Sequence, residues 1–413
     1  MLTNLMGSGT SVPPSYDVSN QSVAYGDFNS DGYGDFAVGL SVSIDLPSGV
    51  DVSGTGDSLN TSKGGRVVVI YGSPKGPQVG TGGFIRRRVN ASSTAQADVV
   101  AKAPCSPDPS NPTLQKCFVQ LLGPSTSTPA LFGFALAAVK SLENANTADG
   151  LIIGDPSANS GDGEVHYLKG GLNGINPDPA TIQVIPAPSP GSANSFGYLV
   201  SSAGDLNGDL RDDIVISAPK VSGGARSGVY AFYGENVAGV GQFAGVATFS
   251  TTPPAMNAIH PTTASLAPQW FVPTDLASDA NAQFGYGLSG IGDFNGDGYS
   301  DVIVNVPRGD FELDVLKPET GFTIIYFGSR YGLRTNSVPS INPKCYAFGT
   351  SDETCEPFIS YLPDSTSYEN TYVSNAAAGD INGDGLKDVL IGGFGRNHSS
   401  GLAFSSGVFY VLY

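Results

Sequence analysis

The chain has 413 residues, of which 55 are glycine and 29 are proline. These two residue types are spread along the whole length, which is typical of many turns between short strands and predicts an all-β protein. The formal net charge of −17 opposes a phosphate backbone or an anionic lipid surface, so nucleic acid is not an expected partner. Charged residues make up only 14% of the chain, so we expect the acidic ones to be concentrated in particular places.

The N-terminal segment, Met1 to Thr10, has no basic region followed by an apolar one, and nowhere does the sequence reach 18 consecutive apolar residues. We therefore expect no direct membrane insertion. We interpret the chain as a mature or excised part of a larger secreted or surface protein.

One acidic motif, with the spacing Asp-x-Asn-x-Asp-x-x-x-Asp, occurs four times along the chain. The copies begin at Asp27, Asp205, Asp293 and Asp380. Each copy is followed at once by an apolar run, which predicts a buried strand. The four runs cover residues 36–39, 214–219, 302–307 and 389–392.

Further β-type runs complete each repeating unit. A third run lies at 66–72, 228–234, 321–328 and 407–413, and a fourth at 117–122, 181–185, 269–272 and 358–362. A degenerate copy over 132–168 keeps the strands but has residues 142–149 in place of the acidic motif. The sequence thus predicts five four-stranded units, approximately 17–122, 131–185, 195–272, 284–362 and 372–413 plus 1–6.

The last unit ends on its third strand, whereas Leu2 to Met6 stand before the first unit, where a fourth strand is needed. An N-terminal strand added to the last sheet would hide both edges and close a single β-propeller domain over residues 1–413. We count five blades, although residues 98–104 imitate a strand and could mark another blade. Otherwise residues 73–116, with Arg86, Arg87 and Arg88, form a long solvated loop.

The acidic motif offers three carboxylates and one amide at positions one, three, five and nine, and a main-chain carbonyl at position seven. Such an all-oxygen set suits Ca²⁺ better than zinc or copper. An EF-hand is excluded because its acidic twelfth position is occupied here by Val38, Ile216, Val304 and Ile391. Leu210 replaces the sixth-position glycine of the other copies, so we expect a weaker site there.

We predict about four structural calcium ions, each of which relieves the repulsion among the carboxylates of one loop. The predicted side-chain ligands are Asp27, Asn29, Asp31, Asp35, Asp205, Asn207, Asp209, Asp213, Asp293, Asn295, Asp297, Asp301, Asp380, Asn382, Asp384 and Asp388. The predicted carbonyl ligands belong to Tyr33, Arg211, Tyr299 and Leu386.

Short family signatures flank these loops. They are Phe132-Gly133, Phe196-Gly197, Phe284-Gly285 and Ser217-Ala218-Pro219. With the acidic loops, they resemble the FG-GAP repeats of integrin α-subunit heads and many bacterial surface proteins. The resemblance implies an extracellular or cell-surface adhesion module that recognises a protein or glycan on a cell or in the matrix. Integrin heads have seven blades, so seven blades stay open beside five.

Catalytic groups are sparse in the sequence. His166, His260 and His398 are isolated, and we find neither an HExxH motif nor a nucleophile elbow, so no catalytic residues and no cofactor besides calcium are expected. A carbohydrate-binding or carbohydrate-processing propeller stays open as the alternative, because a fold does not determine a function.

Strand alternation places the acidic loops at one end of each sheet. The four cysteines lie at the same end, and two disulfides, Cys105 with Cys117 and Cys345 with Cys355, are expected in an oxidising compartment; four free thiols are the alternative. The opposite end carries residues 40–65 and the tripeptide Arg308-Gly309-Asp310. This tripeptide can occur by chance in a chain of this length. The family resemblance implies that this opposite end is the ligand face.

Overall fold

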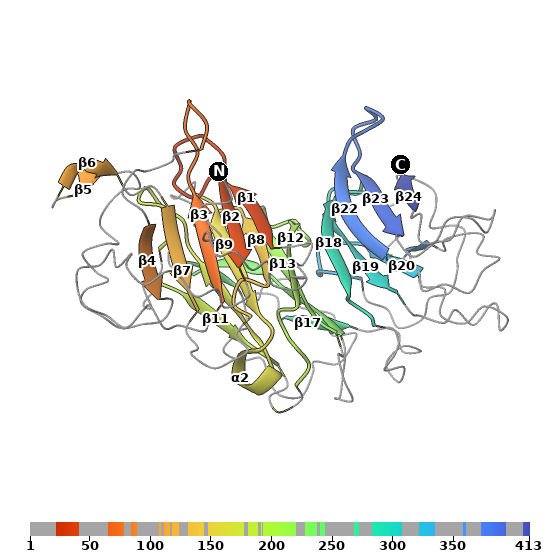
Figure 1. Ribbon diagram of the computed structural model, residues 1–413. Coiled ribbons are helices and arrows are strands. Elements are labelled where there is room, and N and C mark those ends of the chain that lie inside the picture. Colours follow the sequence, from red (N-terminus) through yellow and green to blue (C-terminus); the bar gives the residue numbers. More distant parts are fainter. Residues whose placement is uncertain are drawn as a thin grey trace, which may run out of the picture. The chain divides into compact units, whose positions relative to one another are not determined.

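The computed structural model falls into two compact units, Met1–Pro186 and Ala187–Tyr413 (Figure 1). It describes residues 22–40, 65–77, 84–88, 107–108, 111–115, 118–123, 131–143, 148–176, 181–188, 191, 193–219, 228–237, 240–243, 268–271, 283–307, 322–334, 358–360, 373–393 and 408–413. Nearly all regular structure in these residues is antiparallel sheet, which confirms the all-β prediction.

The first unit opens with four antiparallel strands that pair in chain order. They are β1 (Val23–Gly26), β2 (Asp35–Leu40), β3 (Arg66–Ile70) and β7 (Phe118–Leu122). A fifth strand, β4 (Phe84–Arg88), pairs in parallel with β7. The prediction of a long loop was therefore wrong at 84–88, because β4 uses the main-chain edge that β7 offers.

A small ribbon and a meander complete the first unit. The ribbon consists of β5 (Pro107–Asp108) and β6 (Asn111–Gln115), also within the segment predicted as loop. The meander comprises β8 (Ala135–Val139), β9 (Gly150–Asp155), β10 (Glu164–Leu168) and β11 (Gln183–Pro186), with a one-turn helix α2 (Ala158–Gly161) between β9 and β10. This sheet confirms the strands of the degenerate copy, and its β8 packs beside β1.

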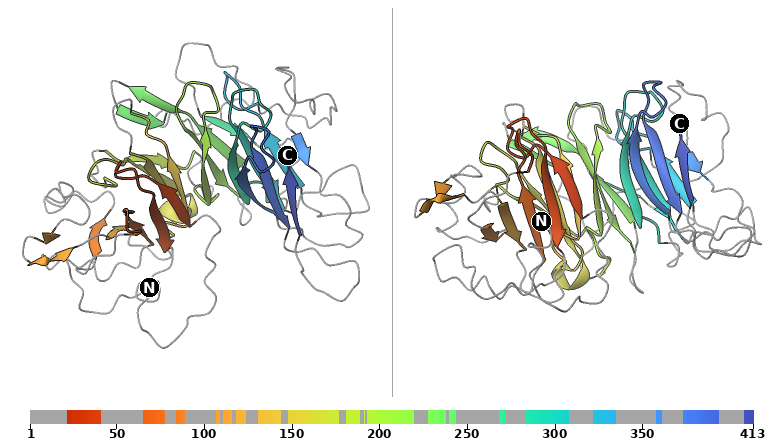
Figure 2. Two further views of the ribbon diagram at one scale, coloured as in Figure 1. Left: turned by 90° about the horizontal axis from the view of Figure 1, so that it is seen from above. Right: turned by 45° about the horizontal axis from the view of Figure 1, so that its top comes forward.

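Three further sheets and a ribbon form the second unit. The strands are β12 (Leu199–Gly204), β13 (Asp213–Ala218), β14 (Gly228–Phe232) and β17 (Gln269–Phe271); β18 (Gly287–Gly292), β19 (Asp301–Val306), β20 (Phe322–Tyr326) and β21 (Phe358–Ser360); and β22 (Val373–Gly379), β23 (Asp388–Gly393) and β24 (Val408–Leu412). The ribbon pairs β15 (Gly234–Val237) with β16 (Val240–Phe243). In Figure 2 the first strands of these sheets, β12 in light green, β18 in teal and β22 in blue, follow one another across the unit, in agreement with the contacts between them.

The predicted strands that fall within the described residues are confirmed, four in each of the first four sheets and three in the last. Residues 1–6 and 98–104 lie outside the described residues, so ring closure, the number of blades and the single-domain assignment stay predictions. The cysteines, the Arg308-Gly309-Asp310 tripeptide, His260 and His398 lie outside them too. Among the described residues, no helix has the length and apolar character needed to cross a membrane.

The hydrophobic core of each unit lies between successive sheets, and the acidic loops contribute to it. The residue after the first aspartate of the loop is buried where a following sheet covers it, as for Phe28, Leu206 and Phe294. The carbonyl oxygen of Leu206 also accepts a hydrogen bond from Ser329 N, 3.0 Å away in the next sheet. In the last sheet, the equivalent Ile381 is 52% exposed. Each of the first three loops is therefore part of a joint between two sheets.

Truncating the side chain after the first aspartate should destabilise the protein strongly at a covered loop and hardly at all at the uncovered one. Leu206→Ala should lower the free energy of unfolding by about 2–5 kcal/mol, because it removes a fully buried side chain from the core. Ile381→Ala should change it by less than about 0.5 kcal/mol, since that side chain is half exposed. Urea unfolding of both variants measures the difference, and equal losses would contradict the joint.

Candidate metal loops

The four acidic loops connect the first strand of a sheet to the second. In each sheet the register places the glycine before the first aspartate opposite the ninth-position aspartate, as in Gly26 opposite Asp35. The same pairing holds for Gly204 with Asp213, Gly292 with Asp301 and Gly379 with Asp388. The strands therefore fix both ends of every loop before any side chain of the turn is considered.

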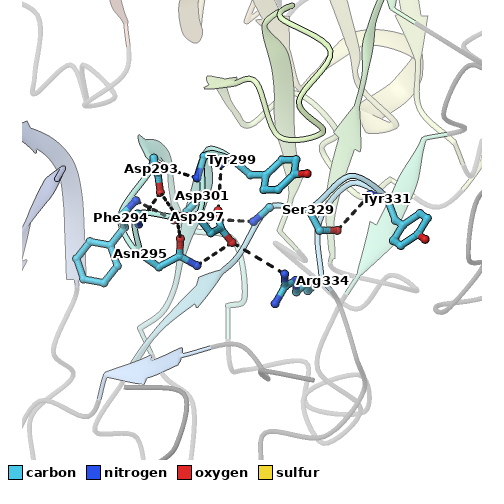
Figure 3. Close-up of polar contacts among 12 residues, drawn as sticks. Asp293, Phe294, Asn295, Asp297, Tyr299, Asp301, Ser329, Tyr331 and Arg334 are labelled. Carbon is cyan, nitrogen blue, oxygen red and sulfur yellow. Dashed lines mark hydrogen bonds and ion pairs between the residues drawn. The ribbon is translucent and has the colours of Figure 1, made fainter. Parts of the chain in front are cut away.

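The first aspartate folds the turn around its own carboxylate, as Figure 3 shows for Asp293. Asp293 Oδ1 accepts hydrogen bonds from Gly296 N at 2.7 Å and Asp297 N at 3.1 Å, and Oδ2 accepts one from Gly298 N at 2.9 Å. Asp205 and Asp380 accept the same three main-chain bonds in their loops. The turn is thus closed by the side chain of its own first residue.

The sixth position adopts a left-handed conformation, which glycine accepts without strain. Its φ is 82° at Gly32, 89° at Gly298 and 92° at Gly385. Leu210 adopts the same conformation, with φ at 66°, and its side chain is 93% exposed. The loop from Asp205 therefore carries backbone strain that a Cβ atom imposes, in the place that the sequence indicated.

The third and fifth positions lie beside the first aspartate (Figure 3). Asn295 Oδ1 accepts from Asp297 N at 3.0 Å, and Asn295 Nδ2 donates to Asp297 Oδ2 at 3.1 Å. Asp297 Oδ2 also lies 3.9 Å from Arg334 Nη2, in an ion pair whose two side chains are largely buried. The structure thus brings the predicted ligands at positions one, three and five to the same turn.

The ninth-position aspartates are buried beneath the loops. Asp301 Oδ2 accepts from Phe294 N at 2.8 Å, and Oδ1 accepts from Gly328 N at 2.9 Å, beyond the third strand. Asp35 and Asp213 make the same pair of bonds. Asp388 Oδ2 accepts from Ile381 N, while Oδ1 has no partner among the described residues. The ninth aspartate therefore anchors the loop to the sheet, a role that the spacing alone did not reveal.

The described residues contain no ready-made cluster of three or more carboxylate, imidazole or thiolate groups around one metal position. The predicted side-chain ligands nevertheless belong to one turn between two paired strands, and the ninth aspartate also accepts main-chain hydrogen bonds there.

The carboxylates of one loop act on one another electrostatically. Burial raises the pKa of Asp35 to about 6, and the charges of Asp31 and Asp27 add to the shift, although main-chain hydrogen bonds from Gly72 and Phe28 oppose it. Burial likewise raises the pKa of Asp213 and Asp301 well above the usual range, with the other aspartates of each loop contributing. The folded loops therefore bind a proton more tightly than the unfolded chain does.

The remaining sequence candidate within the described residues is His166 in β10. Its side chain is fully buried, Nε2 lies 3.1 Å from Glu164 Oε1, and its ring contacts Phe132 edge-on. These contacts fit the interpretation of an isolated core histidine.

Comparison with known proteins supports the resemblance read from the sequence. The profile of the FG-GAP repeat matches residues 284–326, which include the loop from Asp293 to Asp301 and strands β18 to β20. This part of the chain is therefore similar to an FG-GAP repeat. The chain is also 30% identical to integrin alpha-6 of Gallus gallus over 148 residues, which are 35% of this chain and 10% of that protein. The chain thus spans about a tenth of the length of this curated relative.

The raised pKa of Asp35 generates a pH prediction for protein freed of divalent cations. Because the folded pKa of about 6 exceeds the ordinary value of 3.8, the folded state holds the proton more tightly. The stability that Asp35 contributes is present below about pH 4 and is lost as pH rises through about 6. Between pH 4 and 7 the melting temperature should therefore fall less steeply with rising pH for Asp35→Asn than for the unmodified chain. If the melting temperatures of the two proteins depend on pH in the same way, the raised pKa of Asp35 is contradicted, whatever the absolute stability of the variant.

Proposed function

We propose that the chain is a calcium-stabilised recognition module at the cell surface that binds a protein ligand. The observation that carries the proposal is one oxygen-rich turn, built by the same hydrogen bonds in four sheets of a chain with a segment similar to an FG-GAP repeat. The similarity to an integrin α subunit supports an extracellular location within a larger surface complex. No catalytic role is proposed.

Calcium would be held at each turn by the side chains at positions one, three and five and the carbonyl at position seven. In the loop from Asp293 these are Asp293, Asn295, Asp297 and the carbonyl of Tyr299. The donors are all oxygen, which suits a hard cation. The ion would supply positive charge between carboxylates that otherwise repel. The ninth aspartate completes the predicted ligand set, and its main-chain bonds hold the turn ready for the ion.

A closed propeller is the architecture that these sheets support best. The antiparallel strands of the five sheets pair in chain order, apart from β4 at the edge of the first sheet, and the first strands of neighbouring sheets pack together within each unit. We propose five blades in one domain, with residues 1–6 as the missing strand beside β24. This arrangement leaves no long sheet edge open to other chains.

The ligand face is proposed at the end of the sheets opposite the acidic loops. Consecutive antiparallel strands place the connections between second and third strands at that end. They include residues 41–64 and the segment with Arg308-Gly309-Asp310, both outside the described residues. The acidic loops, in contrast, are occupied in joining sheets.

Metal analysis tests the calcium part of the proposal. After dialysis against calcium-free buffer, the chain should retain about four calcium ions, and chelation should lower the melting temperature, because an ion bound only by the folded state stabilises it. Asp293→Asn and Asp380→Asn should each remove one ion. Zinc in place of calcium, or no bound metal, would refute this part.

Variants at the two ends of the sheets should affect different properties, with ligand binding reduced at one end and stability reduced at the other. Shortening residues 41–64, or replacing Arg308 and Asp310 together by alanine, should reduce binding to target cells or matrix at an unchanged melting temperature. Asp293→Ala should lower the melting temperature while the folded fraction binds normally. Loss of binding in folded Asp293→Ala, together with normal binding in the loop variants, would place the ligand at the calcium end.

A further inference from the structure

The second sheet, whose own loop lacks the acidic motif, contacts the first acidic loop through Asp149. Asp149 Oδ2 accepts a hydrogen bond from Asp27 N at 2.9 Å, and Asp149 N donates to Asp27 O at 2.8 Å. A third bond, from Gly171 N to Phe28 O at 3.1 Å, follows one residue later. The main chain at the first position of the loop is therefore held on both sides by a residue 122 positions away.

Asp149 is buried, so its negative charge needs compensation. Lys140 supplies it, with Nζ at 3.2 Å from both carboxylate oxygens and a side chain that is itself 74% exposed. The pair therefore provides a fixed acceptor for Asp27 N together with a cation that stays in solvent. In the second sheet, a lysine thus does for Asp149 what a metal ion would do for the acidic loops.

The space around this contact is filled. A Cβ atom at Gly26 would lie 3.0 Å from Asp149 Oδ2 and 3.1 Å from Ala138 Cβ. The glycine before Asp27 therefore allows the close approach of the two sheets. A side chain at position 26 would require Asp149, Phe28 or Ala138 to shift by a few tenths of an ångström.

The other covered loops have a different neighbour at this place. Ser300 N donates to Asp205 O at 2.8 Å, and Lys387 N donates to Asp293 O at 3.2 Å, which are the counterparts of the bond from Asp149 N. Neither serine nor lysine carries a carboxylate. An acidic side chain from the following sheet is therefore a property of the first loop.

We propose that Asp149 is a positioning residue for the first calcium loop, so that calcium bound there joins the first and second sheets. The inference rests on the proposed calcium binding. Asp149 fixes the main chain of the first ligand, Asp27, and Lys140 limits the extra negative charge that Asp149 brings to the site.

Calcium titration calorimetry on the full chain tests this role, with Asp27→Asn as the reference that removes the first site. Asp149→Ala should weaken one of the four sites by about tenfold, the usual cost of losing a residue that orients a ligand, and leave the others unchanged. In the Asp27→Asn background, Asp149→Ala should have no further effect on calcium affinity. Asp149→Asn should weaken the site less, because the amide oxygen still accepts from Asp27 N.

Two control variants separate positioning from general damage. Ser300→Ala, at the equivalent place beside the loop of Asp205, should leave all affinities unchanged. Gly26→Ala should weaken the same site as Asp149→Ala, which provides a second test where Asp149→Ala does not fold. Absence of calcium binding by the unmodified chain would refute the proposed function. Normal binding by that chain and unchanged affinities in folded Asp149→Asn and Gly26→Ala would overturn the positioning role alone.

Discussion

The buried carboxylate at the ninth position of each acidic loop is the interaction on which the sheets depend. In three sheets its two oxygens accept main-chain hydrogen bonds from the start of the loop and from the glycine beyond the third strand. One side chain thereby ties three parts of a blade-like sheet together. An ionised carboxylate is costly to bury, so these bonds and the charges nearby determine whether the sheet end is stable.

The first three of these loops also connect one sheet to the next within each unit. Their second residue enters the core, and the main chain of their first residue bonds to the following sheet, as at Asp205 with Ser300. Anything that orders the turn therefore also orders the joint between two sheets. A cation at the turn would act on both, which gives a calcium site in this chain a reason to be structural.

This arrangement separates two demands on the molecule. Strand ends at the acidic loops are committed to hydrogen bonds and core contacts, so variation there would disturb the joints. The connections at the other end vary in length between the sheets, and most of them lie outside the described residues. The described segments there also contribute to the core, as Phe132 and Phe284 do. Under the proposed function, recognition would use the longer connections at that end.

The sequence by itself determined the five units, their strands, the four acidic turns and the FG-GAP resemblance, because apolar runs and aspartate spacing are local patterns. Tertiary structure decided the rest. The anchoring of Asp301 depends on Gly328, and the hold on Asp27 depends on Asp149, so both rest on residues that only the fold brings near. Strand β4 was missed for the same reason, since three arginines hide its strand pattern and pairing with β7 supplies the hydrogen bonds. The local spacing of aspartates determines that a turn forms. Which segments that turn connects is determined by hydrogen-bond partners that lie 27 and 122 residues away in the sequence.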